Sequence, residues 1–209
     1  MRPPVRPMLE GTSVVPVLAF REVAPTLRLI GNMIDSGLRV IELTLRSPVA
    51  METLVQAKAQ FGDRAAIGMG TILTPEQLRD VVDAGADFGV SPGLTPVLSD
   101  AIAASNLPFL PGTANVSQAM AAQEQGFDVI KFFPAEQSGG AGALKAIGAV
   151  LPDVLICPTG GVSSKNTKDY LALPNVACVG SSSLTALAAA DPFDAAAFAQ
   201  ELSHYARPT

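Results

Sequence analysis

The chain has 209 residues, of which 48% are hydrophobic and only 16% are charged, and its net charge is −5. Soluble domains usually carry about 25% charged residues, so we expect part of this surface to pack against other subunits. The acidic balance and the lack of a basic run argue against nucleic acid as a partner. No apolar run approaches the length of about 18 residues that a membrane span needs.

The N-terminal stretch MRPPVRPMLEG lacks the apolar segment of a signal peptide. The two cysteines, Cys157 and Cys178, are too few for a disulfide framework, and we expect them to be small core residues. This composition predicts a reduced, cytoplasmic protein without membrane contact.

A single histidine, His204, is expected on the surface of the last helix. Metal sites that need two or three histidines are therefore excluded. A histidine-dependent nucleophile would have to recruit this residue from near the end of the chain. The chemistry is expected to come from Lys, Glu, Asp and Arg side chains, hydroxyls and the backbone.

Short β-branched segments alternate with Ala- and Leu-rich segments along the chain. Strands are predicted to start near Val14 (VVPVLAF), Arg39 (RVIELTL), Ala66 (AIGMGT), Phe88 (FGVS), Phe109 (FLPG), Val129 (VIKFF), Leu155 (LICPTG) and Val176 (VACVGS). Their starts lie about 20 to 27 residues apart, which leaves room for one crossover helix each. Helices are predicted in segments such as PVAMETLVQAKAQF, TPEQLRDVVDAG and NVSQAMAAQEQG, and Gly37, Gly85 and Gly126 are expected to end helices.

Eight such units predict an α/β fold, a (β/α)8 TIM barrel, as one domain over residues 1–209. Residues 1–12 are expected to form a cap or arm. An open, doubly wound sheet is the alternative.

In a barrel, active sites lie at the C-terminal ends of the strands. The predicted ends are rich in Gly, Thr and Ser and read Thr44-Leu45-Arg46, Gly70-Thr71, Ser91-Pro92-Gly93, Pro111-Gly112-Thr113, Phe133-Pro134, Pro158-Thr159-Gly160-Gly161 and Gly180-Ser181-Ser182. Such a mouth offers backbone N–H groups and hydroxyls to an anion.

The stretch VIKFF places Lys131 in the middle of a predicted buried strand. A buried ammonium without a partner costs several kcal/mol. Because side chains alternate along a strand, Glu42 and Lys131 project into one cavity if both polar faces point inward. A desolvated lysine is the usual Schiff-base nucleophile, and a glutamate beside it can move protons. The alternative is a structural ion pair. Arg46 has two interpretations as well, a site for a carboxylate or a surface salt bridge.

The stretches PTGGVSS and VGSSSL follow the seventh and eighth predicted strands. Barrels commonly bind phosphate in these two loops, through backbone N–H groups and a helix N-terminus. Gly160 and Gly161 would allow close backbone approach. The pair of loops therefore indicates a phosphate site.

The motifs VIELTLRSP, GMGTILTPEQ, GADFGVSPGLTP, FLPGTANVSQAM, DVIKFFPAE and PTGGVS resemble those of the 2-keto-3-deoxy-6-phosphogluconate (KDPG) aldolases. These are bacterial class I aldolases of the Entner–Doudoroff pathway, and some also cleave 4-hydroxy-2-oxoglutarate. The resemblance runs from about Val14 to Leu184.

The resemblance implies a role for each matching residue. Lys131 matches the Schiff-base lysine and Glu42 the proton-transfer glutamate. The implied substrate-binding residues are Arg46 and Thr71 at the pyruvate carboxylate, Pro92, and Thr159, Gly160, Gly161 and Ser182 at the sugar hydroxyls and phosphate. The resemblance also implies a homotrimer that needs no metal or cofactor and acts on a small keto-acid sugar phosphate.

The chain departs from the family pattern in two places. Many members read Gly-Gly-Ser-Trp where this chain has Gly180-Ser181-Ser182-Ser183. This difference affects the expected geometry of phosphate binding. A Thr is more usual at the third position of Thr113-Ala114-Asn115, which bears on discrimination among sugars. Two other functions remain open at this point. One is a phosphosugar isomerase or epimerase with Glu42 as base, and the other is a non-catalytic binding protein.

Overall fold

The computed structural model describes residues 3–208. Its strands are β1 (Val14–Leu18), β2 (Val40–Thr44), β3 (Ala66–Gly70), β4 (Gly89–Val90), β5 (Phe109–Leu110), β6 (Gly112–Thr113), β7 (Val129–Phe132), β8 (Leu155–Pro158) and β9 (Val179–Ser181). Its helices are α1 (Arg6–Leu9), α2 (Val23–Asp35), α3 (Ala50–Phe61), α4 (Pro75–Asp83), α5 (Pro96–Ser105), α6 (Val116–Glu124), α7 (Gly140–Val150), α8 (Thr167–Leu171), α9 (Thr185–Ala188) and α10 (Ala195–Ser203).

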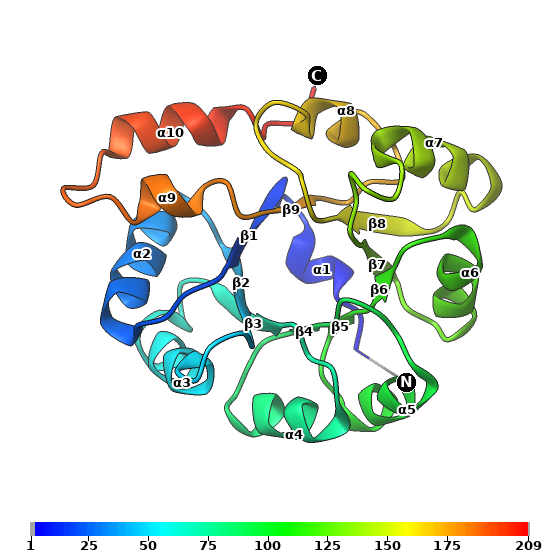
Figure 1. Cartoon of the computed structure of the whole chain (residues 1–209), viewed down its shortest axis with the longest axis horizontal. Helices are drawn as coiled ribbons and strands as arrows, with labels where there is room; N and C mark the ends of the chain where they lie inside the picture. The colour runs from blue at the N-terminus through cyan, green and yellow to red at the C-terminus, as the bar shows by residue number, and fades with distance from the viewer. Residues whose placement is uncertain (1–2, 209) are drawn as a thin grey trace.

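The strands pair in parallel in two sheets. One has the order β5-β4-β3-β2-β1-β9 and the other the order β6-β7-β8. Two isolated parallel bridges, Ile156 to Val176 and Thr159 to Gly180, connect β8 to the β9 segment. Figure 1 shows the strands around the centre of the molecule and the longer helices outside them. The predicted α/β fold with parallel strands is confirmed.

The predicted strands are found at the expected places, with two differences. The fifth is divided into β5 and β6 at Pro111, because proline has no N–H to donate to a neighbouring strand. The eighth starts at Val179 rather than Val176, which forms only an isolated bridge. The glycines expected after helices, Gly37, Gly85 and Gly126, have φ of 100°, 78° and 80°. This left-handed conformation is the usual one for a glycine at a helix end.

Local signals in the sequence explain where several helices begin. The side chains of Thr74, Thr95 and Asn115 accept hydrogen bonds from N–H groups in the first turns of α4, α5 and α6. Proline in the first turn of α4 and α5 suits a position where no N–H partner is lost. None of the helices within residues 3–208 is both long and apolar enough to cross a membrane.

Two clusters of buried residues hold the fold together. In the larger one, strand residues such as Ile41 and Ile67 pack against the surrounding helices. The smaller one joins inward-facing strand residues with Val5 and Leu9 near α1, at 0% and 4% exposure. The carboxylate of Asp128 accepts hydrogen bonds from the N–H groups of Val5 and Arg6 and so fixes the start of α1.

Candidate active site

Lys131 and Glu42 meet in the interior, although they come from strands of different sheets. Nζ of Lys131, on β7, donates to Oε1 of Glu42, on β2, across 3.2 Å. The two side chains are only 8% and 5% exposed. Each charge is therefore desolvated, and each has the other as its partner. The two side chains therefore point toward each other in the interior, as strand alternation predicts.

The immediate surroundings of Lys131 are small and tightly fixed. Its register neighbours are Gly112 on β6 and Cys157 on β8. Its own N–H donates to the carbonyl of Pro111 at 2.9 Å, and its carbonyl accepts from Oγ1 of Thr113 at 3.0 Å. The ammonium also lies 5.5 Å from the ring centroid of Phe133, close enough for a cation–π contact.

Gly70, on β3, makes room for the carboxylate of Glu42. A Cβ at residue 70 would lie 2.0 Å from Oε1 of Glu42, a distance that no real contact allows. Gly112 has a similar role, because a Cβ there would lie 2.1 Å from the carbonyl carbon of Pro92. This close approach brings Pro92 beside the strand that neighbours Lys131. Sequence reasoning placed both glycines at strand ends but did not assign them this role, although a glycine inside a strand often marks such an approach.

Arg46 and Thr71 lie together just beyond the ends of β2 and β3. Nε of Arg46 donates to Oγ1 of Thr71 at 3.3 Å. Thr71 has a φ of 65°, which is strained for a β-branched residue. In the part of the chain that the structure describes, Arg46 forms no salt bridge, so its exposed guanidinium stays available for an anion.

The loops after β8 and β9 also lie side by side. Thr159 is 6% exposed and bridges to Gly180, and a Cβ at residue 180 would lie 2.3 Å from Oγ1 of Thr159. Gly160 and Gly161 have φ of 100° and 80°, so both need the left-handed conformation that glycine adopts without strain. Ser182 follows β9 and is exposed.

Cys157 and Cys178 are free and buried, as predicted for small core residues. A hydrogen bond with Cys157 and burial raise the pKa of the Cys178 thiol, which keeps it neutral. Across residues 3–208 no three His, Cys, Asp or Glu side chains gather in a way that could hold a metal. His204 is exposed at the end of α10, as expected.

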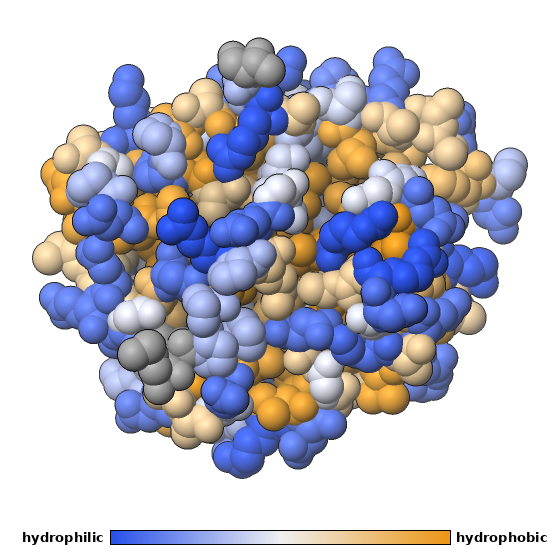
Figure 2. Space-filling view, turned by 180° about the vertical axis from the view of Figure 1, so that it is seen from behind, coloured by the Kyte–Doolittle hydropathy of each residue, from blue (hydrophilic) through white to orange (hydrophobic). Residues whose placement is uncertain are grey.

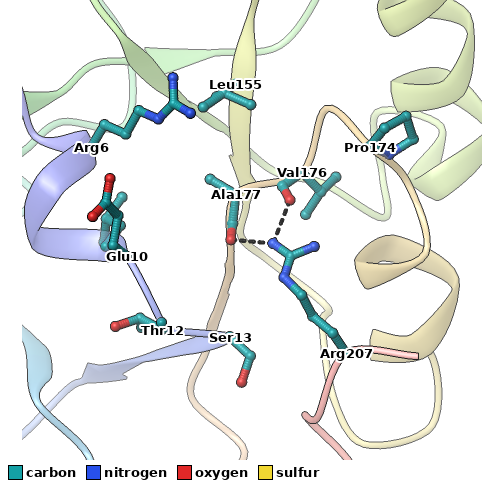
Figure 3. A pocket seen from close by; sticks show the side chains of 11 residues that line it. Arg6, Glu10, Thr12, Ser13, Leu155, Pro174, Val176, Ala177 and Arg207 are labelled. Atoms are coloured by element: carbon teal, nitrogen blue, oxygen red, sulfur yellow. Dashed lines mark hydrogen bonds between the residues drawn. The ribbon is translucent and has the colours of Figure 1, made fainter. Parts of the chain in front are cut away.

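A cavity of about 530 Å³ lies away from these residues, between α1 and the C-terminal segment (Figure 3). Residues just before β1 and β9 line it, so it opens at the amino ends of the strands. Arg207 closes one side by donating to the carbonyls of Val176, at 2.7 Å, and Ala177. The candidate site is therefore defined by the buried pair Lys131–Glu42 and the strand ends, not by this cavity.

The family model for KDPG and KHG aldolases matches residues 5–199. The chain belongs to this family. It is 43% identical to the 2-dehydro-3-deoxy-phosphogluconate aldolase of Pseudoalteromonas atlantica, over 81% of this chain and 78% of that protein. It is 41% identical to the KHG/KDPG aldolase of Escherichia coli K12, over 81% of this chain and 79% of that protein.

A solved structure of a family member is similar over almost the whole chain. The KDPG aldolase of Legionella pneumophila, with pyruvate captured at low pH as a covalent carbinolamine intermediate, has a TM-score of 0.87 and 42% identity. The match covers 93% of this chain and 94% of the other. The family resemblance seen in the sequence motifs is confirmed. Membership of an aldolase family favours the aldolase interpretation over the isomerase and the non-catalytic binding protein.

Proposed function

We propose that this family member is a class I aldolase that cleaves KDPG to pyruvate and glyceraldehyde 3-phosphate. We propose that it also cleaves 4-hydroxy-2-oxoglutarate (KHG) to pyruvate and glyoxylate. The observation that carries the proposal is the buried pair of Lys131 and Glu42, 3.2 Å apart, in the interior of an aldolase-family fold. A lysine in that setting is suited to covalent catalysis on a ketone.

The proposed reaction begins at Lys131. The neutral amine attacks the C2 ketone of the substrate to form a carbinolamine, and loss of water gives an iminium. The positive iminium accepts the electron pair of the C3–C4 bond when that bond breaks. Glu42, directly or through a water, removes the C4 hydroxyl proton, and the aldehyde leaves. The remaining enamine is protonated at C3, and hydrolysis releases pyruvate and restores the lysine.

Substrate binding in this proposal uses two ends of the site. Arg46 and Thr71 hold the pyruvate carboxylate so that C2 lies at Lys131, which is catalysis by positioning. Pro92 contacts the substrate between the ends. Thr159, Gly160, Gly161 and Ser182 receive the hydroxyls and the phosphate. The guanidinium of Arg46, which is exposed beside Thr71 and forms no salt bridge among residues 3–208, and the left-handed glycines support these assignments.

Pyruvate release is the direct test of this function. The purified protein is incubated with KDPG, its galacto isomer and KHG, and pyruvate is measured through lactate dehydrogenase. We expect turnover of KDPG without added metal and in the presence of a chelator. The absence of pyruvate from every substrate would rule the function out.

Ser182→Ala is expected to weaken use of the phosphorylated substrate selectively. A hydrogen bond to a charged group is worth roughly 1.5 to 3 kcal/mol. At about 1.4 kcal/mol per decade, kcat/KM for KDPG should fall by about 10- to 100-fold. Cleavage of KHG, which has no phosphate, should stay nearly unchanged. Equal losses on both substrates would show that Ser182 does not bind the phosphate.

We further propose that the strands close into one eight-stranded (β/α)8 barrel, with β5 and β6 as a single strand interrupted at Pro111. The bridges between β8 and the β9 segment support this closure. We propose that residues 1–209 form one domain with residues 1–12 as a cap, of which residues 1–2 and 209 lie outside the described part. A single cooperative unfolding transition is expected, and two separate transitions would contradict one domain.

We also propose that the enzyme acts as a homotrimer in the cytoplasm, in the Entner–Doudoroff pathway. Large apolar side chains stay exposed on the single chain, namely Val55, Leu73, Val97, Val116, Met120 and Val150. Figure 2 shows apolar residues at several places among the polar ones on one face. Light scattering should give three times the 21.5 kDa chain mass. A monomer at micromolar concentration would contradict the trimer.

A further inference from the structure

The chain has only two tyrosines, and both are buried beside the loops that are proposed to bind phosphate. Tyr170 lies on α8 at 1% exposure, and Tyr205 follows α10 at 0%. A buried tyrosine hydroxyl needs a hydrogen-bond partner. The two hydroxyls find their partners on segments that adjoin Gly160-Gly161 and Ser182.

Tyr205 forms a hydroxyl cluster with the two serines on either side of Ser182. Its hydroxyl lies 3.1 Å from Oγ of Ser181 and also hydrogen-bonds Oγ of Ser183. Oγ of Ser181 donates to the carbonyl of Val162 at 2.7 Å. The cluster therefore joins three segments, which are the end of β9, the loop after β8 and the C-terminal segment.

Ser182 stands apart from this cluster. Its neighbours Ser181 and Ser183 are bonded to each other at 3.0 Å and to Tyr205, but its own hydroxyl has no hydrogen-bond partner among residues 3–208. Ser181 and Ser183 are the two positions that depart from the Gly-Gly-Ser-Trp pattern. Their hydroxyls are occupied by Tyr205, and the Ser182 hydroxyl is left free for a ligand.

Tyr170 acts on the other loop through Glu136. Its hydroxyl donates to Oε1 of Glu136. The N–H of Glu136 donates to the carbonyl of Gly160 at 3.1 Å, and a Cβ at Gly161 would lie 2.5 Å from Cγ of Glu136. The side chain of Glu136 therefore packs against Gly161, and its backbone N–H is bonded to Gly160. Burial and the bond to Glu136 raise the pKa of Tyr170, so the hydroxyl keeps its proton and remains a donor.

The orientation of Glu136 matters because a carboxylate repels a phosphate. A free Glu136 side chain could turn toward an anion bound at Gly160 and Gly161. The hydrogen bond from Tyr170 instead holds the Glu136 carboxylate toward α8.

We propose that Tyr170 and Tyr205 are positioning residues that hold the loops after β8 and β9 in the geometry that receives the substrate phosphate. The proposal rests on the aldolase function proposed above. Neither tyrosine touches the reacting atoms, and each acts through another residue, Glu136 or the serine pair. Their removal should therefore affect phosphate recognition and leave chemistry at Lys131 intact.

The test compares Tyr205→Phe and Tyr170→Phe with the wild type on KDPG and on KHG. Each variant keeps the ring and loses only the hydroxyl. For KDPG we expect KM to rise and kcat/KM to fall, by about 5- to 30-fold for Tyr205→Phe and about 3- to 10-fold for Tyr170→Phe. Tyr205→Phe loses two neutral hydrogen bonds, each worth about one decade or less. Tyr170→Phe loses one hydrogen bond to a carboxylate, and only part of its energy acts on phosphate binding. For KHG, kcat/KM should change by less than about twofold. Trapping of pyruvate with borohydride should equal that of the wild type.

Thr53→Val is the matched control. Thr53, on α3, is also fully buried, and its hydroxyl donates to the carbonyl of Val49 just before that helix, away from both loops. This variant loses one buried hydroxyl and should keep wild-type kinetics on both substrates. Melting curves for all variants show whether a kinetic change follows a general loss of stability.

Three outcomes would overturn the proposal. Equal losses on KDPG and KHG would mean that the tyrosines support the whole barrel, and wild-type kinetics on KDPG would mean that the loops hold their shape without them. Both results would leave the aldolase function standing. Failure of the wild type to release pyruvate from either substrate would instead overturn the function and this proposal together.

Discussion

Lys131→Ala should release no measurable pyruvate from KDPG and should form no reduced adduct with pyruvate and borohydride. The nucleophile is absent in this variant, and no other lysine is paired with Glu42 in the described chain. Loss of a covalent nucleophile can cost about 10⁶-fold in kcat. Mass spectrometry of the wild type should place one reduced pyruvate on the peptide that contains Lys131. Lys145→Ala, at an exposed lysine on α7, is the control and should keep both activity and adduct.

Stability must be measured alongside this activity. Removal of Lys131 leaves the Glu42 carboxylate buried without its partner, which typically costs about 3 to 5 kcal/mol. The double variant Lys131→Met with Glu42→Gln removes both charges and should melt closer to the wild type, while it remains inactive. An adduct on another lysine, or turnover that a chelator abolishes, would refute the Schiff-base mechanism.

Glu42→Gln should lower kcat for KDPG by about 10²- to 10⁴-fold, the usual contribution of a general acid–base group. The glutamine keeps the shape of the side chain, and its amide oxygen can still accept a hydrogen bond from Lys131. Borohydride should therefore still trap some pyruvate at Lys131. A folded variant with nearly wild-type kcat would show that Glu42 does not transfer protons and is only a structural partner of the lysine.

Gly70→Ala tests the position of the same carboxylate without changing its chemistry. The added Cβ would lie 2.0 Å from Oε1 of Glu42, so the carboxylate must move. We expect kcat to fall, with pyruvate still trapped at Lys131. A normal kcat in this variant would argue that the 3.2 Å contact between the two side chains is not needed for catalysis.

Much of the fold was predictable because its signals are local. β-Branched runs, glycines after helices and the spacing of strand starts each depend on a few neighbouring residues, and the parallel strands appear where these signals place them. The proline at residue 111 was visible inside a predicted strand. Whether it divides that strand depends on whether the neighbouring strand would pair with the N–H that proline lacks. The start of β9 depends in the same way on its pairing with β1.

The candidate site was predictable in its members and not in its distances. Alternation indicated that Lys131 and Glu42 share the interior, but their 3.2 Å separation follows from how strands of two sheets face each other. The contacts of Tyr205 with Ser181 and Ser183 join residues more than twenty positions apart. Two isolated tyrosines carry no pattern in the sequence, so only the structure identifies their partners.

The place of β1 in the larger sheet has a consequence for synthesis of the chain. β1 pairs with β2 on one side and with β9, Val179–Ser181, on the other. Ribosomes add about 5 to 20 residues per second, so one edge of β1 stays open for on the order of ten to thirty seconds before β9 emerges. An open edge of an apolar strand is able to pair with another nascent chain. Slow translation therefore lengthens the period in which this chain is exposed to aggregation through the open edge of β1.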